Sequence, residues 1–170
     1  HVEVLRFLKN EFGLAADDAR ANDNYALRLA AQFGHVEVLR FLKDEFGLTA
    51  NDARARDNYA LERAAKNGHE KVLICLKKFG LTADDARGQY NFALEDAAEN
   101  GHVEVMSVLK NDFELTADDA RAGRNKALKK AAQNGHVNVL RFLKDKFGLT
   151  TEDARARENW ALLIAAKNGH

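Results

Sequence analysis

The sequence predicts an all-α protein whose short helices stack into a solenoid, and three observations support this fold class. First, one unit recurs along the 170 residues, because histidine lies at positions 1, 35, 69, 102, 136 and 170, in steps of 33 or 34. Second, each unit holds two segments with apolar residues at helical spacing. Third, proline is absent, and one unit is too small to bury a core alone. Neighbouring units must therefore stack.

The first helix of each unit is predicted from its apolar face. In the first complete unit, Leu27, Ala30, Ala31 and Gly34 follow the i, i+3, i+4, i+7 spacing. Asn24 precedes this face, and we expect its side chain to cap the free N–H groups of the first turn. Gly34 should end the helix. The equivalent first helices are expected over residues 58–67, 91–100 and 125–134.

The second helix is predicted from position 35 to about position 45. Val38, Leu39, Leu42 and Phe46 form its apolar stripe. The equivalent second helices are expected over residues 69–78, 102–112 and 136–146.

A short third helical turn is predicted after each pair. Thr82 and Asp85 have the spacing of a capping box, with aspartate where Glu or Gln is usual. The segment lacks the β-branched and aromatic residues that a strand prefers. The same pattern occurs at Thr49 with Asp52, Thr116 with Asp119, and Thr150 with Asp153.

Residues 30–39, Ala-Ala-Gln-Phe-Gly-His-Val-Glu-Val-Leu, resemble the ankyrin repeat, whose first helix ends in Ala-Ala-x-x-Gly-His and whose second carries Glu-Val-Val-x-x-Leu-Leu. Residues 131–140 match equally, and the resemblance covers the whole chain. The family's Thr-Pro-Leu-His opening appears here as Tyr-Ala-Leu-Glu at 59–62. The resemblance therefore implies an ankyrin-like α-solenoid of stacked helix pairs with short third helical turns and with β-hairpins reduced or absent.

We expect residues 1–170 to form a single ankyrin-like array of four complete helix pairs with a half repeat at each end. Because both ends fall inside a repeat, we expect the biological array to be longer and this chain to be monomeric. The alternative is the 34-residue tetratricopeptide repeat, which needs two longer helices. Gly34 lies between the predicted helices instead of inside one, which favours the ankyrin interpretation.

No pattern predicts an enzyme, a cofactor or a metal site. Zinc ligands lie ~2.0–2.1 Å from one ion, whereas stacked helices lie ~8–10 Å apart, so equivalent histidines cannot share an ion. The resemblance suggests that they hydrogen-bond between repeats. Cys75 has no histidine placed as its base, and no glycine-rich phosphate loop is present. The Asp pairs at 17–18, 84–85 and 118–119, each followed by arginine, are interpreted as complements to the helix dipole.

Composition indicates which class of partner and which cellular compartment to expect. The chain has 26 basic and 26 acidic residues, and a zero balance argues against nucleic acid and membrane surfaces as partners. No apolar run approaches the ~20 residues of a membrane span. A single cysteine suits a reducing compartment, so we expect an intracellular, most simply cytoplasmic, protein.

In ankyrin repeats the first helix lines the concave, partner-binding face, so the resemblance implies a protein-interaction scaffold. Positions beside the buried Leu27, Ala30 and Ala31 are expected to face outwards. The candidate partner-binding residues are Arg28, Leu29, Gln32, Phe33, Arg56, Glu62, Arg63, Lys66, Glu95, Asp96, Glu99, Lys129, Lys130, Gln133, Leu163 and Ile164. The loop positions expected at the tips are Asn22, Arg56, Gln89, Gly123 and Arg157.

Two features of this face stand out. Phe33 replaces the Asn of the other units and is a candidate hot spot, with Trp160 a weaker one. A basic patch of Arg124, Lys126, Lys129 and Lys130 is either a solvated face or a site for an acidic partner. Two other roles stay open: a targeting or accessory segment of a larger enzyme or effector, and a structural spacer.

Overall fold

The computed structural model describes residues 2–88 and 91–170, which are built from α-helices and contain no strand. The helices are α1 Val2–Phe12, α2 Ala16–Gln32, α3 Val36–Phe46, α4 Ala50–Ala53, α5 Ala55–Lys66, α6 Glu70–Phe79, α7 Ala83–Arg87, α8 Phe92–Glu99, α9 Val103–Asn111, α10 Ala117–Gln133, α11 Val137–Phe147 and α12 Thr151–Asn168. This all-α solenoid confirms the predicted fold class.

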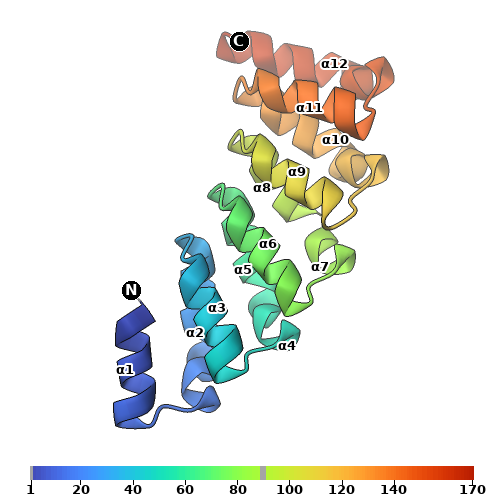
Figure 1. The fold of residues 1–170 in the computed structure, drawn as a ribbon. Helices are drawn as coiled ribbons and strands as arrows, with labels where there is room; N and C mark the ends of the chain where they lie inside the picture. Colours follow the sequence, from blue (N-terminus) through green and yellow to red (C-terminus); the bar gives the residue numbers. More distant parts are fainter. Residues whose placement is uncertain (1, 89–90) are drawn as a thin grey trace.

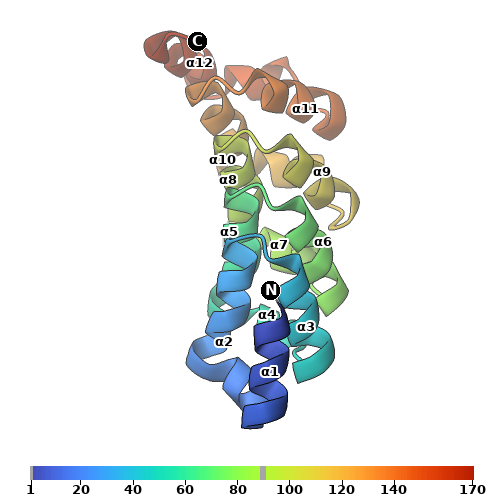
Figure 2. The same cartoon turned by 60° about the vertical axis from the view of Figure 1, so that its left-hand side comes forward.

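The longer helices lie in two parallel rows. The first-helix row consists of α2, α5, α8, α10 and α12, and the second-helix row consists of α1, α3, α6, α9 and α11 (Figures 1 and 2). Each helix packs on its own partner and on the equivalent helices of the neighbouring units, as α5 does on α2, α6 and α8. The two termini consequently lie at opposite ends of the stack.

A continuous apolar core runs between the rows. The first helices contribute a leucine and a pair of alanines, such as Leu61 with Ala64 and Ala65, all at most 1% exposed. The second helices contribute a parallel stripe that includes Leu73 and Leu76, both fully buried. The small alanines allow the facing helices to approach closely, and the leucines fill the space between units.

The short third turns form as predicted. In α7 the backbone N–H of Thr82 donates to Oδ2 of Asp85 at 2.8 Å, and the Thr82 hydroxyl donates to the same oxygen at 3.1 Å. The equivalent bonds join Thr49 to Asp52, Thr116 to Asp119 and Thr150 to Asp153. Each aspartate thus satisfies a donor at the start of its turn.

A left-handed turn connects each short turn to the first helix that follows. Arg56, Asp57 and Asn58 have φ of 54°, 55° and 63°. The same conformation recurs at 22–24, 123–125 and 157–159. These turns lie within the bounds given for α2, α5, α10 and α12, so each of those elements is kinked at its left-handed turn. This turn occupies the place of the hairpin finger of ankyrin repeats. It reverses the local handedness and therefore separates the short turn from the following helix.

The expected N-cap bond of Asn24 does not form. Asn24 has φ of 57°, and its Oδ1 atom is buried without a hydrogen-bond donor, as are those of Asn58, Asn91 and Asn125. Asparagine is one of the few side chains that adopts the left-handed conformation readily. The recurring Asn therefore serves the backbone turn, and the capping prediction is wrong.

Histidines join successive units, as the resemblance suggested. Nε2 of His69 donates to the carbonyl oxygen of Gln32 at 3.0 Å, and His136 makes the equivalent bond to Glu99 at 2.9 Å. The imidazole ring of each lies against the glycine that ends the first helix of the preceding unit. The Gly-His pair therefore forms part of the junction between repeats.

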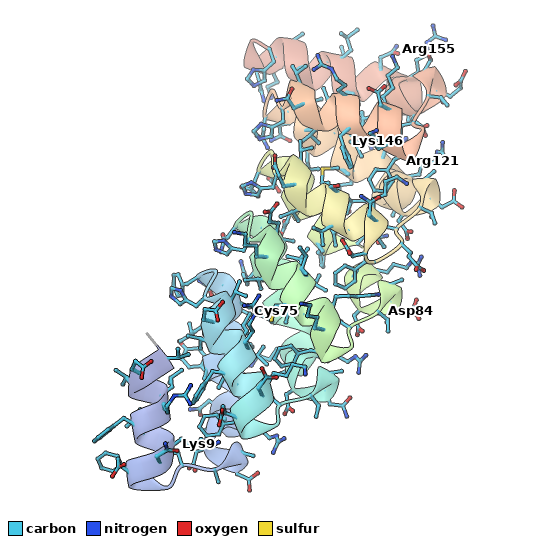
Figure 3. All side chains as sticks on the ribbon, viewed as in Figure 1. Lys9, Cys75, Asp84, Arg121, Lys146 and Arg155 are labelled. Atoms are coloured by element: carbon cyan, nitrogen blue, oxygen red, sulfur yellow. The ribbon has the colours of Figure 1, made fainter. Side chains whose placement is uncertain are left out.

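A ladder of arginine–aspartate pairs also joins the units. Nε of Arg54 donates to Oδ1 of Asp85 at 2.7 Å, across the boundary between two units. The equivalent pairs are Arg20 with Asp52, Arg87 with Asp119, and Arg121 with Asp153. In the Asp84-Asp85 sequence of α7, only Asp85 forms this inter-unit pair. The side chain of Asp84 points outwards and lies 3.1 Å from Arg87 of its own turn (Figure 3). Each arginine thus pairs with an aspartate of the next unit and also complements the dipole of its own short helix.

Candidate partner-binding face

The predicted partner-binding residues differ widely in exposure. Phe33 and Leu163 are 58% and 59% exposed, and Arg56 and Lys66 are also exposed. Half-buried positions are Leu29, Gln32, Glu62, Arg63, Asp96, Glu99, Lys130, Gln133 and Ile164. Among the expected loop tips, Asn22, Gly123 and Arg157 are exposed, and Gln89 lies outside the described residues.

Three charged residues expected to face outwards are buried. Arg28, Glu95 and Lys129 are 6%, 5% and 7% exposed. They occupy equivalent positions near the start of the first helix. This position packs against the left-handed turn of its own unit or against a side chain of the next unit. The expectation of an outward orientation was therefore wrong for these three residues.

Arg28 is held by its own turn and by two aromatic rings. Its Nε and Nη2 atoms donate to the carbonyl oxygens of Asp23 and Asn22, both at 2.9 Å. Its guanidinium lies 5.2 Å and 5.4 Å from the ring centroids of Tyr25 and Tyr59. These bonds close the left-handed turn and connect it to the next unit, which gives Arg28 a structural role.

Glu95 is paired across the boundary to the next unit. Nζ of Lys126 lies 2.5 Å from one carboxylate oxygen, while the other oxygen is buried without a donor. Burial raises the pKa of Glu95, and the Lys126 ammonium opposes this only in part. Lys130 forms a parallel pair with Glu99 at 2.8 Å. Two of the four residues in the predicted basic patch are therefore neutralised by α8.

Asparagines before Gly-His tie the first helices together. Nδ2 of Asn67 donates to the carbonyl oxygen of Gln32 at 2.9 Å, and Asn134 and Asn168 make equivalent bonds to Glu99 and Gln133. Sequence comparison between units singled out Phe33 but did not reveal this role of the asparagines. The recurrence of Asn beside Gly-His was the available signal.

The described residues contain no arrangement that suggests catalysis. Cys75 on α6 is 4% exposed (Figure 3), and burial raises the pKa of its thiol, which disfavours the nucleophilic thiolate. No group of three or more His, Cys, Asp or Glu side chains is placed to hold a metal ion in the described part of the chain. None of the described helices is long and apolar enough to cross a membrane.

Comparison with known proteins accounts for this architecture. A family model described as ankyrin repeats, in three copies, matches residues 61–153, which is more than half of the chain. The search of curated proteins gave no match. Ankyrin repeats are generally protein–protein interaction modules and are typically non-enzymatic. The family match, the paired helices and the Gly-His junctions agree, and the chain belongs to the ankyrin repeat family.

Proposed function

We propose that this chain binds a partner protein through its first-helix row, the side that lines the concave face of ankyrin arrays. The observation that carries the proposal is the exposure of Phe33. An aromatic side chain 58% exposed to solvent stands where other units place an asparagine, which in three of them joins two repeats. Aromatic side chains, phenylalanine included, are enriched at the centres of protein interfaces.

The surroundings of Phe33 favour the same role. Leu29 and Gln32, in the last turn of α2 just before Phe33, are half-buried, and Lys66 of the next unit is exposed. An apolar centre with a polar rim is the usual composition of a protein interface. The zero net charge supports a protein partner over a polyanion. We propose further that the chain acts as a monomer inside the cell.

The test is the affinity for a protein captured from lysate of the source cells and then purified. The first variant combines Phe33→Asn, Arg56→Ala and Lys66→Ala, all at exposed positions. We expect the dissociation constant to rise about tenfold or more, the effect of losing one hot spot. The matched control combines Ile74→Asn, Arg40→Ala and Lys71→Ala, which are exposed on the second-helix row.

Circular dichroism would establish that both variants keep the helical content of the parent. A captured protein that binds the parent and control equally but not the first variant supports the proposal. Equal binding by all three proteins contradicts it. The role of a structural spacer, or of a segment serving a larger enzyme, would then be preferred.

A further inference from the structure

The charges of two arginines reach Lys129 near the carboxyl-terminal end of the first-helix row. Arg124 and Lys129 belong to α10, and Arg157 belongs to α12. Trp160, also on α12, lies beside them, with its ring centroid 5.9 Å from Nζ of Lys129. We call Arg124, Lys129 and Arg157 the cationic cluster.

Within the described residues, no hydrogen bond or ion pair connects the cationic cluster to an acid. Lys129 is only 7% exposed. Burial, and then the charges of Arg157 and Arg124, lower its pKa. Glu158 follows Arg157 in the left-handed turn, but within the described residues it forms no ion pair with the cationic cluster. A buried ammonium beside two guanidinium groups is an unfavourable arrangement unless an anion offsets it.

The first pair of complete units shows what is missing here. There, Nε of Arg56 lies 3.1 Å from Oδ2 of Asp23, so neighbouring left-handed turns are joined by opposite charges. Arg157 occupies the position of Arg56, and Arg124 occupies the position of Asp23. The same register therefore places two like charges in adjacent turns. Lys126 and Lys130, in contrast, already have carboxylate partners on α8.

We propose that the cationic cluster binds one anionic side chain of the partner protein, either a phosphorylated residue or a carboxylate, with Trp160 packing against it. This inference rests on the proposed function and specifies the chemistry of the partner. Arginine and lysine provide several charge-assisted hydrogen bonds to such oxygens. The Trp160 ring adds apolar contact area at the edge of the site.

The neighbouring unit favours a single anionic side chain over a nucleic acid. Asp96 and Glu99 of α8, both half-buried, lie next along the first-helix row. A phosphate backbone that follows the row would meet these carboxylates after one or two contacts. Nucleic-acid affinity depends on many phosphate contacts, so a short cationic cluster flanked by acids suits a peptide better.

Trp160 is the only tryptophan, so its fluorescence reports on the site directly. The probes are a short uncharged peptide with a central serine, the same peptide with phosphoserine or aspartate, inorganic phosphate, and an oligothymidylate. We expect the phosphoserine or the aspartate peptide to give a saturable change that the serine peptide does not give.

Arg124→Asp is the decisive variant, because it recreates the opposite-charge pair that Asp23 forms with Arg56. We expect it to abolish the saturable change. Arg141→Asp makes the same change in charge at an exposed position of α11, on the second-helix row. We expect this control to keep the affinity of the parent to within about twofold, since only screened long-range charge is altered.

Four outcomes would overturn the inference. In the first, neither anionic peptide gives a saturable fluorescence change up to about 10 mM, which corresponds to negligible affinity. Both aspartate variants weaken binding equally, so that only net charge matters. Inorganic phosphate binds as tightly as the phosphopeptide, which assigns the cluster to the free ion. The oligothymidylate binds more tightly than either peptide and is lost with Arg124→Asp, which assigns it to nucleic acid.

These results are separable from the test of the proposed function. The variant with Phe33→Asn, Arg56→Ala and Lys66→Ala leaves the cationic cluster intact. If the captured protein depends on those three residues while no anionic peptide binds, only this inference fails. If an anionic peptide binds but the captured protein binds the parent and the Phe33→Asn, Arg56→Ala, Lys66→Ala variant equally, the proposed function fails.

Discussion

One aspartate in each short turn satisfies two neighbours at once. Asp85 accepts hydrogen bonds from the backbone of Thr82 and from the guanidinium of Arg54, which belongs to the preceding unit. Burial raises the pKa of Asp85, but the bonds from Arg54 and Thr82 lower it further than burial raises it. The ionised carboxylate is therefore favoured in the folded state.

This linkage predicts a loss of stability in acid. A carboxyl whose pKa is lowered by folding contributes stability above its unfolded pKa of about 3.9 and loses it as pH falls through the folded pKa. Asp85→Asn should lower the unfolding midpoint at neutral pH and flatten its decline below about pH 4. Urea unfolding curves of the parent and the variant, recorded from neutral pH to below about pH 4, would measure both effects.

Asp84→Asn is the matched control, because the adjacent Asp84 side chain is 92% exposed. We expect it to leave the midpoint and its acid dependence nearly unchanged. Equal flattening in both variants would show that general charge repulsion, and not the Arg54 pair, sets the acid dependence.

A second residue-scale prediction concerns the glycine before each histidine. Gly68 has φ of 76°, and an added Cβ would lie 2.8 Å from Nδ1 of His102. Gly68→Ala should therefore destabilise the fold by about 1–3 kcal/mol, because left-handed strain and displacement of the ring add together. Gly47→Ala provides the comparison, since Gly47 has φ of 66° and open space around it.

Thermal unfolding of the two alanine variants would separate strain from crowding. A larger loss for Gly68→Ala is the expected result. Equal losses would mean that the histidine ring moves aside without cost and that only the backbone conformation matters.

At the scale of elements, the left-handed turn depends on asparagine for its backbone conformation. Asn58 has φ of 63°, and its Oδ1 atom accepts no hydrogen bond. Asn58→Gly should therefore change stability by less than about 1 kcal/mol, because glycine adopts this conformation freely. Asn58→Val should cost more, since a β-branched side chain is a genuine outlier at positive φ. Chemical denaturation of both variants tests the ordering, and similar losses would assign a structural role to the amide.

The helices could be predicted from the sequence because each carries its own periodicity. Leu27, Ala30 and Ala31 identify the buried face of the first helix without reference to other units. The burial of Arg28 and Lys129 could not be predicted in this way. It depends on Tyr59 and Trp160, which the following unit places over these side chains. The periodicity of one helix predicts which of its residues face the core, but not which residues the next unit covers.

The ladder of arginine–aspartate pairs between units could not be predicted from the sequence for a related reason. An acidic start and a basic end of a short helix are adequately explained by the helix dipole. The bond from Arg54 to Asp85 becomes visible only when successive short turns are placed side by side. The histidine bonds were anticipated because the family resemblance supplied the relative placement of the units.

At the scale of the whole molecule, the main contacts join only adjacent units. α6 packs on α3, α5 and α9, and no comparably extensive contact within the described residues skips a unit. Stability should then be a sum of unit and interface terms. Leu73→Ala, at a fully buried position of α6, should cost about 2–5 kcal/mol.

Hydrogen exchange would show how far this loss spreads. We expect faster exchange in α5, α6 and the helices that touch them, with little change in α11. A uniform increase from α1 to α12 would contradict nearest-neighbour coupling and indicate a single cooperative unit.

The arginine–aspartate ladder also bears on how such a chain grows during evolution. Every internal unit carries an arginine for the unit that follows and an aspartate for the unit that precedes it, as Arg54 and Asp52 do in one unit. A unit duplicated or deleted whole by recombination therefore regenerates a matched junction at its new boundary. Array length can change in one genetic step, while the solvent-facing positions of the copied unit remain free to diverge.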